Sequence, residues 1–240
     1  MTNTDTVIET RSLTRVYGKK ENEFVALNGV NISINKGESV AILGKSGSGK
    51  STLMHLLALL DKPSGGSVVI EGQDASKLPK KQVDRLRNDT FGFVFQQFFI
   101  NANDTVLSNV ILPLKIAGIS RRERTRRGLE VLKAVDLLEK AKNKANNLSG
   151  GQKQRVCIAR ALINNPSIIF ADEPTGNLDS QTGQKIEDLL FKLNKDKEIT
   201  LIIVTHDDEL AARCDRQIRI KDGSLIKEAD TEKGVSSEVR

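Results

Sequence analysis

The chain has 240 residues, of which 38% are hydrophobic, and its 37 basic and 31 acidic side chains give a net charge of +6. This is enough for an ordinary core in one domain, with or without a subdomain. No stretch approaches the ~18 consecutive apolar residues that span a bilayer. The first ten residues, MTNTDTVIET, lack the pattern of a signal peptide. The two cysteines, Cys157 and Cys214, do not have the spacing of a metal site or of a redox motif. We therefore expect a soluble, cytosolic protein with reduced thiols.

The predicted elements alternate between strands and helices along most of the chain. Residues 24–34 have a strand-like pattern, and a turn at 36–38 precedes the apolar run 40–43. A glycine-rich loop follows, and then a helical stretch to Leu60. Further short apolar runs, typical of buried strands, lie at 68–70, 92–95, 168–171 and 201–204, with a helix of i, i+3, i+4, i+7 spacing between the last two. Strands separated by helices predict parallel βαβ units.

One long stretch has a different pattern. Residues 97–165 are mainly helical in pattern and predict a helical subdomain inserted into the α/β fold. We expect a single domain over residues 1–228, with a core formed by about 1–96 and 166–228. Residues 229–240 are charged or small without apolar periodicity, which predicts a flexible tail.

The first chemical motif is the glycine-rich loop, which matches G-x-x-x-x-G-K-[ST] in full. Its residues are Gly44, Lys45, Ser46, Gly47, Ser48, Gly49, Lys50 and Ser51. The loop lies between a predicted strand and a helix, so its N–H groups can surround phosphate oxygens at the positive end of that helix. Lys50 adds a charge for the β and γ phosphates, the Ser51 hydroxyl can ligate Mg²⁺, and Thr52 extends the predicted ATP-binding set. The alternative is a glycine-rich turn without a ligand.

The second motif is IIFADE at 168–173, where an apolar strand ends in two carboxylates. Ligands collect at the carboxyl edge of a parallel sheet. Asp172 is therefore predicted to hold Mg²⁺, and Glu173 to act as the general base that polarises the attacking water. The alternative is a carboxylate pair that caps the turn at Pro174.

The third motif places a second anion site about a hundred residues after the first. Ser-Gly-Gly again stands at the start of a predicted helix, within Leu148, Ser149, Gly150, Gly151 and Gln152. The motifs GKSGSGKS, LSGGQKQRV, IIFADEP, NLDS and IVTH occur in the order found in ABC (ATP-binding cassette) transporter ATPases, and the chain resembles that family over residues 7 to about 228. The resemblance implies a RecA-like P-loop NTPase core with an N-terminal antiparallel β segment and an inserted helical subdomain.

The resemblance also implies a homodimer in which each ATP lies between the phosphate loop of one subunit and the signature LSGGQ of the other. By the same match, Gln96 is the glutamine that contacts Mg²⁺ or the water and couples to the membrane subunit. Asp179 is the D-loop aspartate, and His206 is the switch histidine near the γ-phosphate. Tyr17 occupies the place of an aromatic residue that stacks on adenine; the alternative is a partly buried strand tyrosine.

Within the family, GFVFQQF, NVILPLKIAG and ADEPTGNLDSQTG resemble macrolide-exporter and lipoprotein-release ATPases. This resemblance implies a motor at the cytoplasmic face of a membrane, driving a separate permease that exports or extracts a peptide, lipid, lipoprotein or drug-like substrate. ATP and Mg²⁺ are the expected cofactors, and no nucleic acid is expected. Two alternatives remain open: a nucleic-acid-associated ABC ATPase, and an isolated P-loop kinase or GTPase. The basic segment 121–127 is predicted to be a solvated helix face.

Overall fold

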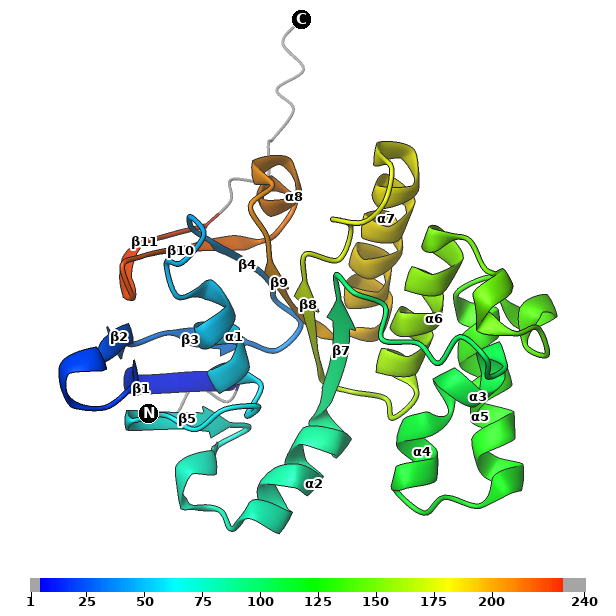
Figure 1. Ribbon diagram of the computed structural model, residues 1–240, viewed down its shortest axis with the longest axis horizontal. Helices are drawn as coiled ribbons and strands as arrows, with labels where there is room; N and C mark the ends of the chain where they lie inside the picture. Colours follow the sequence, from blue (N-terminus) through cyan, green and yellow to red (C-terminus); the bar gives the residue numbers. More distant parts are fainter. Residues whose placement is uncertain (1–4, 231–240) are drawn as a thin grey trace, which may run out of the picture.

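A six-stranded sheet lies at the centre of the structure, a computed structural model that describes residues 5–230 (Figure 1). The strand order is β11-β10-β4-β9-β8-β7, and all neighbours are parallel except β11, which runs antiparallel to β10. The strands are β4 (Ser39–Leu43), β7 (Phe91–Phe95), β8 (Ile168–Asp172), β9 (Thr200–Val204), β10 (Arg216–Lys221) and β11 (Ser224–Asp230). Every residue of β4 and β9 is buried, because parallel sheets are covered on both faces.

A second sheet is antiparallel and packs beside the first through α1. Its strands are β1 (Thr6–Tyr17), β2 (Phe24–Val30), β3 (Ser33–Asn35), β5 (Gly65–Ile70) and β6 (Gln73–Asp74). The prediction of one strand over 24–34 is wrong: β2 ends at Val30 and β3 begins at Ser33. The Thr10 side chain separates them, because its hydroxyl donates to the Val30 carbonyl (3.0 Å) and accepts from the Ile32 N–H (2.9 Å).

Eight α-helices occur in the described residues, with four short 3-10 turns. The helices are α1 (Lys50–Leu57), α2 (Lys80–Thr90), α3 (Val106–Val110), α4 (Leu112–Ile116), α5 (Arg121–Ala134), α6 (Gly150–Leu162), α7 (Ser180–Lys197) and α8 (Asp208–Ala212); the 3-10 turns are Lys20–Asn22, Ala75–Lys77, Leu138–Lys140 and Ala145–Asn147. Helix α1 is shorter than predicted. It ends at Leu57 because Leu59 adopts a left-handed conformation (φ 55°), and the Arg87 guanidinium donates to the Leu59 carbonyl (3.0 Å).

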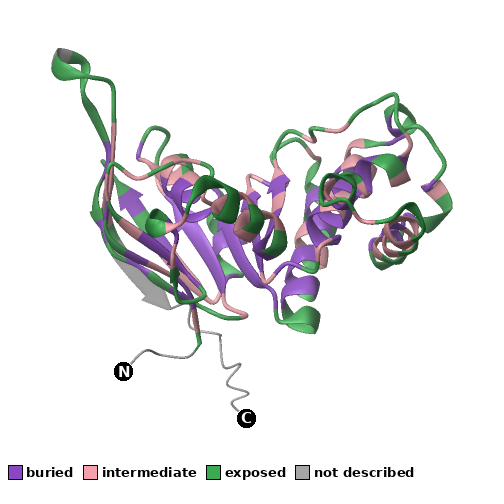
Figure 2. Ribbon diagram, turned by 90° about the horizontal axis from the view of Figure 1, so that it is seen from below, coloured by how far each residue is buried: buried purple, intermediate pink, exposed green. Residues whose placement is uncertain are grey.

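Two apolar cores lie on the two faces of the parallel sheet. Successive side chains of a strand point to opposite faces, so Ala41 and Leu43 of β4 join one core while Val40 and Ile42 join the other. The first core holds α6, α7 and the helices at the right of Figure 1, and the second holds α1 and the antiparallel sheet. Figure 2 shows the buried residues concentrated in the sheet and α6 and the exposed ones on the outer helices.

The regular elements between β7 and β8 are helical, from α3 to α6. The tail predicted at 229–240 lies outside the described residues from 231 onward, and residues 229 and 230 end β11. Among residues 5–230, no helix is both long and apolar enough to cross a membrane.

Candidate functional site

Four neighbouring strands bring the predicted site residues to one edge of the sheet. Strands β4, β9, β8 and β7 are adjacent and parallel, so their carboxyl ends meet at the same edge, where ligands bind in such sheets. The phosphate loop follows β4 and His206 follows β9. Asp172 and Glu173 stand at the end of β8, and Gln96 follows β7.

The phosphate loop is a tight connection between β4 and α1. Gly49 has φ 105°, and a Cβ there would lie 2.5 Å from the Ala26 carbonyl oxygen of β2, so a side chain is excluded. The Lys50 ammonium group folds back onto its own loop and donates to the carbonyls of Gly44 (2.7 Å) and Lys45 (2.9 Å). The Ser48 hydroxyl is buried without a partner among the described residues. Two carbonyls at the start of the loop therefore hold the Lys50 ammonium group, and a bound phosphate would have to replace them as its hydrogen-bond acceptors.

The carboxylates at the end of β8 lie in different surroundings. The pKa of Asp172 is raised above its ordinary value, mainly by burial of the carboxyl group and secondly by the negative charge of the neighbouring Glu173. Glu173 continues the β8–β9 pairing through its N–H to the Val204 carbonyl (2.9 Å), but with φ 44° it leaves strand geometry. Its Oε1 lies 2.7 Å from Nδ1 of His206, and its Oε2 accepts from the Thr205 hydroxyl (3.3 Å).

Gln96 and the loop after β8 are held together by backbone and amide contacts. Asn177 Nδ2 donates to the Gln96 carbonyl (2.9 Å). Gln154, which sequence reasoning did not single out, is fully buried in α6, and its Nε2 donates to the carbonyls of Pro174 (2.5 Å) and Phe95 (3.4 Å). Helix α6 is thus bonded to the end of β7 and to the loop that follows β8. The sequence signal for Gln154 is only its place in LSGGQKQ, since its partners are 20 and 59 residues away.

The signature residues form the start of α6, away from the phosphate loop. Ser149 caps the helix in a reciprocal pair with Gln152: Gln152 N–H donates to Ser149 Oγ (3.3 Å), and Ser149 N–H donates to Gln152 Oε1 (3.1 Å). A side chain on Gly151 would collide with the Thr182 methyl group at the start of α7. Asp179 caps α7 by accepting from the Thr182 N–H (3.0 Å). Strands β7 and β8 separate α6 from α1 in Figure 1. Within one chain, the signature at the start of α6 and the phosphate loop before α1 therefore do not form a single site.

Tyr17 ends β1 at the molecular surface and belongs to a three-residue cluster. Its hydroxyl donates to Asp61 Oδ2 (2.9 Å), and the guanidinium carbon of Arg15 lies 4.4 Å from its ring centroid. Arg15 also forms an ion pair with Asp61 at 2.9 Å. The ring is therefore held from its edge and from one face. Asp61 was not foreseen, because it is 44 residues from Tyr17.

Comparison with known proteins identifies the chain's relatives. Residues 27–176 match the family model described as "ABC transporter". The chain belongs to the ABC transporter family. It is 44% identical over 220 residues to the lipoprotein-releasing system ATP-binding protein LolD of Syntrophus aciditrophicus, covering 92% of this chain and 99% of that one. It is also 44% identical over 227 residues to the macrolide export ATP-binding/permease protein MacB of Aggregatibacter actinomycetemcomitans, spanning 95% of this chain but only 35% of MacB.

The fold agrees with solved ABC cassettes. A dimeric structure of the cassette MJ0796 in a post-hydrolysis state, bound to ADP and Pi, superposes with a TM-score of 0.85 at 44% identity, covering 95% of this chain and all of that one. MJ0796 is an ABC transporter ATP-binding protein of Methanocaldococcus jannaschii. The predictions of a P-loop NTPase fold, of ATP as the bound nucleotide and of ATPase activity are confirmed. The kinase or GTPase alternative is wrong, and nothing in the comparisons supports the nucleic-acid alternative.

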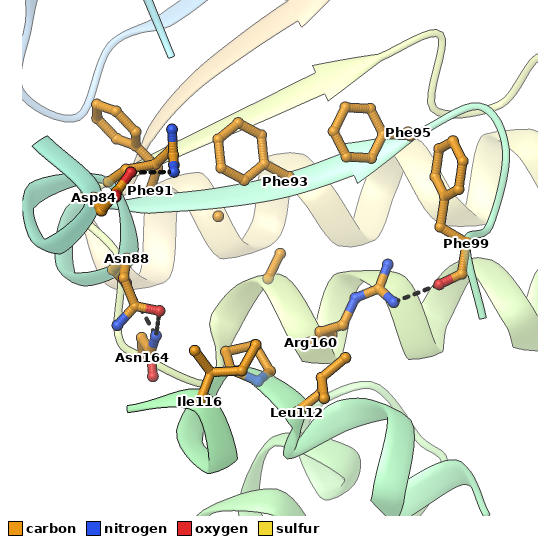
Figure 3. Close-up of a pocket in the computed structure, with 14 residues that line it drawn as sticks. Asp84, Asn88, Phe91, Phe93, Phe95, Phe99, Leu112, Ile116, Arg160 and Asn164 are labelled. Carbon is orange, nitrogen blue, oxygen red and sulfur yellow. Dashed lines mark hydrogen bonds and ion pairs between the residues drawn. The ribbon is translucent and has the colours of Figure 1, made fainter. Parts of the chain in front are cut away.

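This ABC ATPase has a further groove of about 480 Å³ on the side of β7 (Figure 3). The groove lies between β7, α2, α4 and α6. Its exposed apolar side chains are Phe99, Leu112 and Ile116. Arg160 of α6 holds the segment after Gln96 by donating to the Phe99 carbonyl (2.8 Å). Helix α6 therefore connects the signature at its start with this groove near its end.

Proposed function

We propose that this chain is the ATP-hydrolysing subunit of a transporter whose permease is a separate polypeptide, and that it acts as a homodimer. The convergence of the phosphate loop, Asp172, Glu173 and His206 at one sheet edge carries the proposal. The full-length match to LolD, a protein named as the ATP-binding component of a releasing system, supports a separate permease. We propose one ATPase domain over residues 1–228, with the core (1–96 and 166–228) holding the site and the helical subdomain (97–165) carrying the signature.

Hydrolysis is proposed to depend on Lys50, Glu173 and His206. On ATP binding, Lys50 leaves the carbonyls of Gly44 and Lys45 for the β and γ phosphate oxygens. The Glu173 carboxylate accepts a proton from the attacking water. His206, already 2.7 Å from Glu173 Oε1, orients that carboxylate and lies where the γ-phosphate enters. The hydrogen bond from Thr205 keeps the second carboxylate oxygen occupied.

Oxygen donors at the same edge fit a magnesium ion. The residues are Ser51, Gln96 and Asp172, which offer a hydroxyl, an amide and a carboxylate, the hard ligands that Mg²⁺ prefers. Residues 5–230 contain no group of three or more His, Cys, Asp or Glu side chains that could hold a metal ion without other ligands. Nucleotide phosphates and water would therefore supply the remaining ligands of the Mg²⁺ ion. When bound, Mg²⁺ would neutralise charge on the β and γ phosphates. The raised pKa of Asp172 supports this role, because a half-buried carboxylate gains from a cation.

The signature is proposed to act on the ATP of the partner subunit. Its capping box leaves the remaining N–H groups at the start of α6 available to an anion. Leu148 to Gln152 and the phosphate loop lie apart within one chain, so a second copy must supply the opposed site. Asp179 at the start of α7 would lie at the same interface. The dimeric structures described for MJ0796 support this arrangement.

Tyr17 is proposed to stack on adenine. One face of its ring is covered by Arg15, which leaves the other face for the base. Phosphate recognition would then come from residues 44–52, from Gly44 to Thr52. Base–aromatic stacking contributes roughly 1 to 3 kcal/mol.

The groove beside β7 is proposed to receive a cytoplasmic segment of the permease. Its exposed Phe99, Leu112 and Ile116 fit an apolar helix face, and Arg160 connects it with the signature helix. The subunit would thus work at the cytoplasmic face of a membrane. Its cargo is proposed to be a peptide, lipid, lipoprotein or drug-like molecule, on the likeness to LolD and MacB.

Recovery of a membrane protein tests this function. The tagged chain should recover a multi-span protein from detergent-solubilised native membranes. Leu112→Asp should reduce that recovery, whereas Leu138→Asp should not, because both leucines are 44% exposed but only Leu112 lines the groove. Recovery of only soluble partners, or equal loss in both variants, would contradict the proposal.

A further inference from the structure

The basic segment 121–127 has two parts in the structure. Arg126 forms ion pairs with Glu123 (2.6 Å) and Glu130 (2.7 Å), so its charge is compensated within α5. Arg127 also pairs with Glu123, and Arg124 donates to the Ile119 carbonyl. Arg121 and Arg122, in contrast, are exposed and have no partner among residues 5–230. Two uncompensated cations therefore lie at the start of α5, and four residues separate them from the end of α4, which lines the groove.

The other side of the groove carries a similar pair. Asp84 and Asn88 of α2 line the groove. Residues three and four apart share a helix face, so Lys80 and Lys81 lie one turn before Asp84 on that face. Both lysines are exposed, and neither has a partner in the part of the chain that the structure describes.

The acidic residues of α2 do not offset these charges. Asp84 pairs with Arg87 (2.7 Å), and Asp89 pairs with Arg85 (3.4 Å). Lys115 of α4, exposed beside the groove, adds one more cation. In Figure 1, α2 and the turn from α4 to α5 both lie along the lower edge of the molecule. The groove therefore has an apolar floor and two basic borders.

We propose that these borders bind the anionic phospholipid headgroups of the membrane around the permease. The inference rests on the proposed function, because a groove that receives a cytoplasmic segment of a membrane protein faces the bilayer. We define the basic rim as Lys80, Lys81, Lys115, Arg121 and Arg122. Each Lys or Arg near an anionic surface strengthens binding roughly fivefold. The cations of the basic rim lie on two separate borders of the groove. This arrangement fits a planar membrane surface better than a single polynucleotide strand, which would follow one continuous row of cations.

Vesicle sedimentation of the nucleotide-free protein tests the proposal. The protein should bind vesicles of phosphatidylcholine mixed with phosphatidylglycerol more strongly than vesicles of phosphatidylcholine alone, and added salt should weaken this binding. The test variant combines Lys80→Gln, Lys81→Gln, Arg121→Gln and Arg122→Gln. It should lose at least tenfold in affinity while keeping the parent's basal ATPase rate and melting temperature.

A charge-matched variant distinguishes the contribution of the basic rim to vesicle binding from that of the protein's net charge. It combines Lys185→Gln, Lys192→Gln, Lys195→Gln and Lys197→Gln, four exposed lysines of α7, and should retain most of the vesicle binding. Equal losses in the two variants, or no preference of the parent for anionic vesicles, would overturn the proposal. Tighter rim-dependent binding to a single-stranded oligonucleotide than to vesicles would also overturn it. Permease recovery in detergent does not require a bilayer, so it reports on the proposed function separately.

Discussion

Replacement of Glu173 by glutamine is the sharpest test of the hydrolytic mechanism. The amide keeps the shape of the side chain and can still accept the Thr205 hydrogen bond through its oxygen, but it cannot take a proton from water. Hydrolysis should fall by about 10² to 10⁴, equivalent to roughly 3 to 5 kcal/mol of activation free energy. Phosphate release under saturating ATP measures this loss, and ATP binding should survive.

The structure predicts that this loss is not a stability defect. The substitution weakens the contact with His206, whose side chain is 79% exposed. Exposed ion pairs contribute at most about 1 kcal/mol to the free energy of unfolding, which corresponds to roughly 2 to 4 °C in melting temperature for a domain of this size. A melting temperature far below the parent's would mean that Glu173 supports the fold.

Blocked hydrolysis should also trap the shared nucleotide site. Glu173→Gln should form a dimer with ATP and Mg²⁺ and remain a monomer with ADP, as measured by size-exclusion chromatography with light scattering. Adding Ser149→Arg should abolish the dimer without removing ATP binding by each monomer, because the bulky side chain enters the opposed anion site. Hydrolysis at the parent rate would refute the general-base role of Glu173. A dimer indifferent to Ser149→Arg would refute the shared-site geometry.

Three further predictions concern single side chains. Tyr17→Ala should weaken ATP binding, whereas Tyr17→Phe should retain most of it because stacking tolerates loss of the hydroxyl; equal losses in a nucleotide titration would argue against stacking. The hydrogen bond to Glu173 raises the pKa of His206 above its ordinary 6.5, so the stability from this pair is present below pH 6.5 and is lost as pH rises through the raised pKa. Proton NMR should show that pKa falling in Glu173→Gln, and an unchanged value would contradict the pairing. Burial raises the pKa of Cys157 to about 11 and of Cys214 to about 12, so Ellman's reagent should react rapidly only after denaturation; fast labelling of the native protein would contradict the burial.

Local patterns in the sequence were sufficient for the central strands and the phosphate loop. The runs at 40–43, 168–171 and 201–204 are apolar throughout because the parallel sheet is buried on both faces. The strand-to-helix transition at Gly44–Ser51 depends on neighbouring residues, so a short window contains its signal.

Elements with one exposed face were less visible. Strand β10, RQIRIK, alternates polar and apolar residues in its second half and has a charged residue at each end. It therefore lacks the continuous apolar run that predicts a buried strand. The division of 24–34 into two strands depends on Thr10, which lies outside that window. Such long-range hydrogen bonds have no signature in local composition.

The sequence alone was sufficient to predict the chemistry of each loop: glycines and a lysine for phosphate at 44–51, two carboxylates at 172–173, and an anion-binding helix start at 149–152. These properties follow from residue type and spacing. Which of these loops lie together depends on the tertiary structure. Parallel pairing of β4, β9 and β8 brings the loops of 44–51, 172–173 and 206 to one edge, while the start of α6 lies across β7 and β8. The reason is that strand order and helix placement depend on burial of the two sheet faces, and burial is a property of the whole chain.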